Sequence, residues 1–227
     1  RFGVSSILLL GFARAMEGPI RLPRRDLVPL LLLGALGFGI YQMLWASALQ
    51  VTKAGTSSLL IATAPIFTML IASAIGVDTF SRARGAGAVV AFAGVALVIA
   101  EGTGLSLENG AQLIGALVTL GAAVLWAVYM SFGVPFLRRH TPLLTTAWAM
   151  LGGGIALAPV GLVQLSSMPP EAWSAPVLLA LAYSGLFASA LSNVVVFRAV
   201  RHLGPTRVAN MQFLVPALTV VLAAILL

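Results

Sequence analysis

Eight apolar segments fill most of this chain, and basic residues alternate between the loops that join them. A transmembrane helix needs about 20 mostly apolar residues. Six segments reach that length, one is shorter, and an N-terminal one resembles the end of a further span. Only 8% of the chain is charged, whereas a soluble domain carries about 25%. The sequence therefore predicts an all-α polytopic membrane protein. In chain order the segments are residues 2–13, 27–50, 54–76, 85–100, 111–134, 142–163, 174–199 and 205–227.

The distribution of basic residues predicts how these segments are oriented. Of the 13 Lys and Arg residues, one precedes the first segment, one occupies an even-numbered loop and the rest occupy odd-numbered loops. The positive-inside rule assigns the odd-numbered loops to the cytoplasm. The net charge of +7 then reflects topology and the anionic inner leaflet, not a nucleic-acid partner. We expect a multi-pass protein of the bacterial inner membrane. The residues on the odd-numbered side, in the loops or at the segment ends that border them, are Arg14, Arg21, Arg24, Arg25, Arg82, Arg84, Arg138, Arg139, Arg198, Arg201 and Arg207.

The chain also contains a weak internal repeat. Shifting it by 151 residues places Pro65 on Pro216 and Gly34 on Gly185. In each half a helix ends in a short turn and a second helix follows, with a proline near its middle. The charge pattern gives the two halves opposite orientations, which is typical of the inverted repeats of secondary transporters. An old duplication in a non-transporting scaffold or receptor is the alternative.

An inverted repeat requires an odd number of helices in each unit, and four are visible in each half. We therefore expect two inverted five-helix repeats, with eight transmembrane helices visible of an expected ten. The first repeat would cover residues 1–101 and lack its N-terminal helix. The second would cover residues 110–227 and lack its C-terminal helix.

Two runs carry a resemblance to a known family. ALQVTKAGTSSLLIATAPIFTML, from residue 48, resembles the first repeat of the EamA family in the drug/metabolite transporter superfamily. AVRHLGPTRVANMQFLVPALTVVLAAILL, from residue 199, resembles the second. The resemblance implies a ten-helix carrier of which this chain is helices two to nine. The family motif identifies the family but not the substrate. Asp78 departs from the pattern, because members commonly have Glu there.

The polar side chains in the interiors of the apolar segments are uncharged, and Arg198 lies near a segment end. Proton relays and sites for strongly anionic substrates need embedded ionisable groups, and none is evident. We therefore expect a small neutral, zwitterionic or amphipathic substrate, such as an amino acid or a drug, moved by alternating access in export or exchange. Aromatic walls with a few amides suit such solutes. The predicted substrate-binding residues are Tyr41, Gln42, Trp45, Thr63, Trp126, Tyr129, Asn193 and Gln212.

Each of these residues also has a structural interpretation. Tyr41 and Trp45 are four apart and share a helical face. Trp126 and Tyr129 suit cavity lining and lipid-facing packing about equally. Amides such as Asn193 can join neighbouring helices. The prolines, Pro65 and Pro216, are either hinges or static kinks, and the glycines at 34, 37, 39 and 152–154 are expected to allow close helix packing.

Other function classes find little support. Cysteine is absent, which excludes disulfides and thiol chemistry. His140 and His202 fall in loops, where we expect them to be solvated and not to ligate a metal. No nucleophile has an acid–base partner at membrane depth, so we expect no enzyme, no catalytic residue and no cofactor. A channel would show a charge ring or a carbonyl filter. The expected partners are the bilayer and a small-molecule substrate, and a homodimer is left open.

Overall fold

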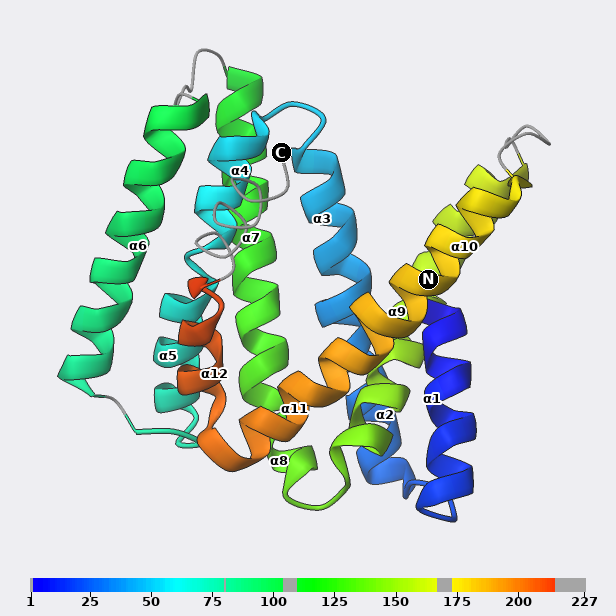
Figure 1. The fold of residues 1–227 in the computed structure, drawn as a ribbon. Coiled ribbons are helices and arrows are strands. Elements are labelled where there is room, and N and C mark those ends of the chain that lie inside the picture. The colour runs from blue at the N-terminus through cyan, green and yellow to red at the C-terminus, as the bar shows by residue number, and fades with distance from the viewer. Residues whose placement is uncertain (1, 80, 104–109, 167–172, 215–227) are drawn as a thin grey trace. The chain divides into compact units, whose positions relative to one another are not determined.

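The computed structural model describes residues 2–79, 81–103, 110–166 and 173–214, and these form helices joined by turns (Figure 1). Two of the helices, η1 and η3, are π-helices. The order is α1 (Phe2–Met16), α2 (Arg24–Gly34), η1 (Ala35–Ile40), α3 (Tyr41–Ala48), α4 (Ala54–Ile61), α5 (Ala64–Ala74), α6 (Arg82–Thr103), α7 (Gly110–Phe132), α8 (Val134–Leu137), α9 (Pro142–Ser166), α10 (Ala175–Tyr183), η3 (Ser184–Leu191), α11 (Ser192–Leu203) and α12 (Pro205–Met211).

Within the described residues, five helical stretches are long and apolar enough to cross a membrane. They coincide with predicted segments, and the all-α polytopic fold class is confirmed. The predicted segment 85–100 lies within α6, while α1 is a shorter apolar helix. The five stretches are Arg24–Ala48, Gly55–Ala74, Gly110–Leu137, Pro142–Ser166 and Ala175–Leu203.

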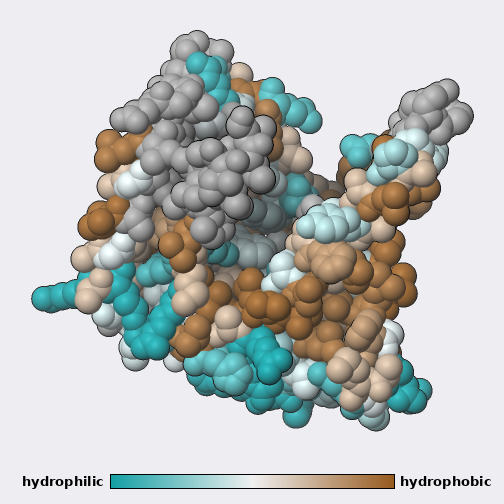
Figure 2. Space-filling view, in the orientation of Figure 1, coloured by the Kyte–Doolittle hydropathy of each residue, from teal (hydrophilic) through white to brown (hydrophobic). Residues whose placement is uncertain are grey.

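Large apolar side chains cover much of the outer surface of these helices. Ile7 on α1 is 67% exposed and Leu179 on α10 is 71% exposed. Figure 2 shows apolar residues over α11 and α1. Such a surface would be costly in water but is suited to lipid, where apolar side chains face the hydrocarbon and backbone polar groups are satisfied within helices.

The helices form two compact units. Unit 1 consists of Arg1–Ile40 and Phe132–His202, and unit 2 consists of Tyr41–Ser131 and Leu203–Leu227. Each unit therefore combines segments from both halves of the sequence. The proposed repeat boundaries, 1–101 and 110–227, stay a prediction.

Close backbone contacts through glycine organise unit 1, where α1, α2 and η1 pack on α9. A Cβ added to Gly34 would lie 1.7 Å from the carbonyl oxygen of Ala149, and one added to Gly152 would lie 2.0 Å from that of Leu31. No side chain fits at either position. The predicted packing role of these glycines is confirmed, in the manner of small-residue interfaces between membrane helices.

In unit 2, single close contacts and hydrogen bonds connect α7 to several other segments. At Gly115 an added Cβ would lie 1.9 Å from Thr52 Oγ1, so the start of α7 lies tightly against the turn that follows α3. The hydroxyl groups of Ser57 and Thr119 are 3.4 Å apart and link α4 to α7. The Ser131 hydroxyl donates to a backbone carbonyl of α5. Helix α12 packs beside α5 (Figure 1).

The prediction that Pro65 lies near the middle of a continuous helix is wrong. The chain forms a turn at Ala62 and Thr63, and Pro65 occupies the first turn of a new helix, α5. Proline lacks an N–H and is well suited to the first turn of a helix, where no intrahelical acceptor is available. The predicted segment 54–76 is therefore two helices, α4 and α5, that together form one span. Pro216 lies outside the described residues.

The π-helices provide structural support for the internal repeat. The shift that aligns Pro65 with Pro216 also places Ile40, the last residue of η1, on Leu191, the last residue of η3. Both π-helices follow an α-helix and lead directly into another. π-Helical turns are rare, and these two end at positions that the shifted sequence makes equivalent.

Candidate functional site

Four of the predicted substrate-binding residues form an aromatic cluster in unit 2. The rings of Tyr41 and Trp45 stack on one face of α3, with centroids 6.4 Å apart and planes inclined by 18°. The Tyr41 ring is 5.5 Å from that of Trp126 on α7. Trp126 is in turn 5.4 Å from Tyr129. The predicted common face of Tyr41 and Trp45 is confirmed.

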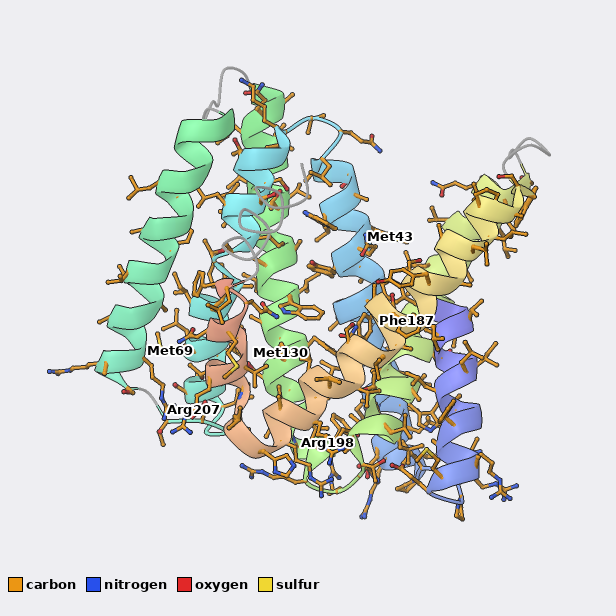
Figure 3. The ribbon with its side chains drawn as sticks, viewed as in Figure 1. Met43, Met69, Met130, Phe187, Arg198 and Arg207 are labelled. Atoms are coloured by element: carbon orange, nitrogen blue, oxygen red, sulfur yellow. The ribbon has the colours of Figure 1, made fainter. Side chains whose placement is uncertain are left out.

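Packing between α3 and α7 holds the aromatic cluster in position. Gly115 brings the two segments together, and Met130 and Tyr129 are fully buried on α7. Figure 3 labels Met43 on α3 and Met130 on α7. Tyr41, Trp45 and Trp126 are only half-buried. The cluster thus has an anchored end at Tyr129 and a more accessible end at the other three rings.

The cluster also contains an unused hydrogen-bond donor. Trp45 Nε1 is shielded from solvent, and the described part of the chain offers it no hydrogen-bond partner. A buried indole N–H normally finds an acceptor, because leaving it unsatisfied costs about 1–3 kcal/mol. The cluster can therefore stack on an apolar or planar group and donate a hydrogen bond to a carbonyl or carboxylate oxygen.

The other predicted residues have different surroundings. The Thr63 hydroxyl donates to the carbonyl oxygen of Leu60 at 2.6 Å, within the break between α4 and α5. Gln42 on α3 and Gln212, in the turn after α12, are half-buried in unit 2. Asn193, on α11, belongs to unit 1 and donates from Nδ2 to the carbonyl of Ser189, in the preceding η3, at 2.8 Å. The binding role of all eight residues stays a prediction.

The sequence analysis did not identify a buried charge cluster in unit 1. Asp26, at the start of α2, is almost fully buried and accepts hydrogen bonds from Arg139 Nη1 at 2.5 Å and His140 Nε2 at 2.8 Å. The prediction that His140 is solvated is therefore wrong. A buried carboxylate requires partners, and His140 is one of them. His202 is exposed, as predicted.

A second acidic residue, in the turn after α5, links that turn to the starts of α6 and α12 in unit 2. Asp78, after α5, pairs with Arg84 at 3.1 Å and accepts a hydrogen bond from the backbone N–H of Thr206, at the start of α12, at 3.4 Å. Burial raises the pKa of Asp78, but hydrogen bonds from Thr206, Thr79 and Arg84 lower it, and the net pKa lies below its ordinary value. Both carboxylates, of Asp26 and Asp78, thus accept hydrogen bonds close to helix ends.

Helical spans with an apolar outer surface define a polytopic membrane protein. Comparison with known proteins specifies the family. The sequence profile of the EamA-like transporter family matches residues 1–100 and 113–227. The chain belongs to this family, and it is a transporter of the EamA type.

Individual relatives agree with this assignment. The chain is 27% identical over 229 residues to the uncharacterized transporter YyaM of Bacillus subtilis, covering 98% of this chain and 73% of that protein. It is 34% identical over 207 residues to a probable terminal-alkyne amino-acid exporter of Streptantibioticus cattleyicolor, covering 90% of this chain and 67% of that protein. A solved crystal structure shares the fold, with a TM-score of 0.82 at 18% identity over 99% of this chain and 75% of the other.

Proposed function

We propose that this transporter exports or exchanges small zwitterionic or amphipathic metabolites, with amino acids bearing apolar side chains as the leading class. The aromatic cluster is the observation that carries the proposal. Its rings offer an apolar surface, and the Trp45 N–H offers one donor to a carboxylate. The amino-acid exporter of Streptantibioticus cattleyicolor, 34% identical, is consistent with this substrate class.

The proposed mechanism is alternating access between two inverted repeats. Tyr41, Trp45 and Trp126 contact the substrate, and Gln42, on the same helix as Tyr41 and Trp45, supplies a further polar group. The break at Thr63, just before Pro65, interrupts the backbone hydrogen bonds between α4 and α5 and acts as a hinge. Its counterpart in the second half is Pro216, by sequence alignment. The matching positions of η1 and η3 support the two-fold relationship that such a mechanism requires.

The proposed location is the bacterial inner membrane with the odd-numbered loops in the cytoplasm. The orientation follows from the positive-inside rule, because nearly all basic residues lie on the side of the odd-numbered loops. The start of α2 with Arg24, the turn after α8 with Arg139, and the end of α11 with Arg201 would then lie at the cytoplasmic surface.

Substrate uptake into proteoliposomes tests the site. W45F keeps an aromatic ring but removes the N–H donor, so the KM for a carboxylate-bearing substrate should rise. A hydrogen bond to a charged group contributes about 1.5–3 kcal/mol, which corresponds to a rise of about tenfold or more. W126A should reduce uptake further by removing a central ring of the cluster.

Trp173 provides a matched control. It lies before α10, is exposed and does not belong to the cluster. W173F should therefore leave the KM within about twofold of wild type. Equal kinetic constants for W45F, W126A and W173F would refute the proposed site. Absence of saturable uptake by folded wild-type protein would instead favour the scaffold or receptor interpretation.

A further inference from the structure

Unit 1 contains a groove that transport by the aromatic cluster does not use. Two adjoining cavities, of about 270 Å³ and 430 Å³, open where the end of α1, the start of α9 and the end of α11 meet. Glu17, Thr141 and Arg201 line both cavities. We call this pair of cavities the basic groove.

The basic groove has an excess of positive charge. Arg198, Arg201 and His202 line it from α11, and Arg139 lines it from the turn before α9. Arg139 is occupied by Asp26. Arg198 and Arg201 are exposed and form no ion pair with any residue that the structure describes. Two guanidinium groups are therefore available to an anion.

The one carboxylate that lines the basic groove is already engaged. Glu17 Oε2 accepts a hydrogen bond from the Thr141 hydroxyl, and Thr141 Oγ1 in turn accepts one from the backbone N–H of Leu144. Thr141 thus caps the start of α9, a helix of 25 residues. The positive end of this helix dipole faces the same region and adds to the attraction for an anion.

The groove is also partly apolar and lies at the end of a membrane-spanning stretch. Met16, Leu143 and Val194 line the larger cavity beside the cations. Figure 3 labels Arg198 near the end of α11 that leads into α12. In Figure 2, hydrophilic residues gather at this end of α11, below the apolar surface over α11 and α1. Charged and apolar groups therefore meet near one end of a membrane-spanning stretch.

We propose that the basic groove binds the phosphate headgroup of an anionic phospholipid such as phosphatidylglycerol. Arg198 and Arg201 would bind the phosphate oxygens, because guanidinium groups form strong, directional hydrogen bonds to phosphate. Met16 and Val194 would contact the first methylene groups of the acyl chains. Basic pockets between transmembrane helices at the cytoplasmic surface are suited to such headgroups, and a soluble anion would gain nothing from the apolar wall.

Lipid titration of the purified, delipidated protein in neutral detergent tests the proposal, with bound lipid counted by native mass spectrometry. Wild type should bind phosphatidylglycerol at least tenfold more tightly than phosphatidylcholine. Each arginine contributes about fivefold to binding of an anionic lipid, so R198Q/R201Q should weaken phosphatidylglycerol binding about 25-fold. R198K/R201K should retain part of the affinity, because it keeps the charge but loses the planar donor geometry.

A charge-matched control separates a specific site from general attraction. Arg82 and Arg207 are exposed and line neither cavity, so R82Q/R207Q should bind within twofold of wild type at 150 mM salt. Circular dichroism and size-exclusion chromatography verify folding of each variant. If R198Q/R201Q does not fold, the single variants replace it, each with an expected fivefold loss.

Three results would overturn the proposal. One is equal binding of phosphatidylglycerol and phosphatidylcholine by wild type. Another is an equal loss of binding in R82Q/R207Q and R198Q/R201Q. Arg198 and Arg201 would then attract anionic lipid no more specifically than other cytoplasmic arginines. The third is displacement of the lipid by glycerol phosphate at a similar concentration, which would identify a site for a soluble anion.

Discussion

Replacement of Gly152 by alanine should destabilise unit 1 severely. The added Cβ would lie 2.0 Å from the carbonyl oxygen of Leu31 and 2.8 Å from its Cα. These atoms belong to the backbone of α2, so no side-chain rotation can make room. Restoring even a 3.0 Å separation would require α9 and α2 to move apart by about 1 Å, and the close backbone contact at Gly34 would be lost with it.

Overpacking of this kind costs about 1–3 kcal/mol, and sometimes more. For a protein of 150–250 residues each kcal/mol corresponds to about 2–4 °C in Tm, so G152A should lower the unfolding midpoint by about 2–12 °C. Thermal unfolding in mild detergent, followed by circular dichroism or intrinsic fluorescence, measures the change.

Gly161 provides a matched control in the same helix. A Cβ added there meets no atom within 4 Å, and alanine has the higher helix propensity. G161A should therefore leave the midpoint unchanged or raise it slightly. If G152A unfolds at the temperature of wild type and of G161A, the close approach of α2 and α9 is wrong.

Three further predictions follow from the charge clusters and the helix break. The folded-state pKa of Asp78 is below its ordinary value of 3.8, so its contribution to stability is present above that pH and is lost as the pH falls through the folded-state pKa. The Tm difference between wild type and D78N should thus shrink below about pH 4, and a constant difference down to pH 3 would contradict this. D26N should lower Tm more than R138Q, because Asp26 is buried between Arg139 and His140 whereas Arg138 is exposed. An equal decrease in Tm for the two variants would contradict this prediction. P65A should slow substrate exchange several-fold with an unchanged KM, and an unchanged exchange rate would exclude a hinge at Pro65.

The sequence was sufficient to predict the features that depend on local composition. Apolar length defines the spans, and Gly34 and Gly152 have the small size that close helix packing requires. The spacing of Tyr41 and Trp45 placed both rings on one face. Trp126 joins them because it lies on α7, which packs against the segment that contains Tyr41.

The features that the sequence did not predict depend on contacts between distant segments. Asp26 and His140 are more than a hundred residues apart, and no periodicity connects them. Asp26 directly follows Arg24 and Arg25, and a short charged stretch of this kind does not by itself indicate burial. The helix break at Pro65 was missed because a proline inside an apolar segment fits both a kink in one helix and the first turn of a second. The sequence analysis did not predict the π-helices, because both lie within continuous apolar segments that fit an ordinary α-helix.

The most direct test of the central claim is counterflow in liposomes. Liposomes that contain the protein are preloaded with one amino acid from an apolar series, and uptake of the same labelled amino acid is followed over time. A carrier that works by alternating access predicts transient accumulation above equilibrium that saturates with substrate and requires the preloaded solute. If folded protein shows no accumulation with any apolar or zwitterionic solute, the proposed function is contradicted.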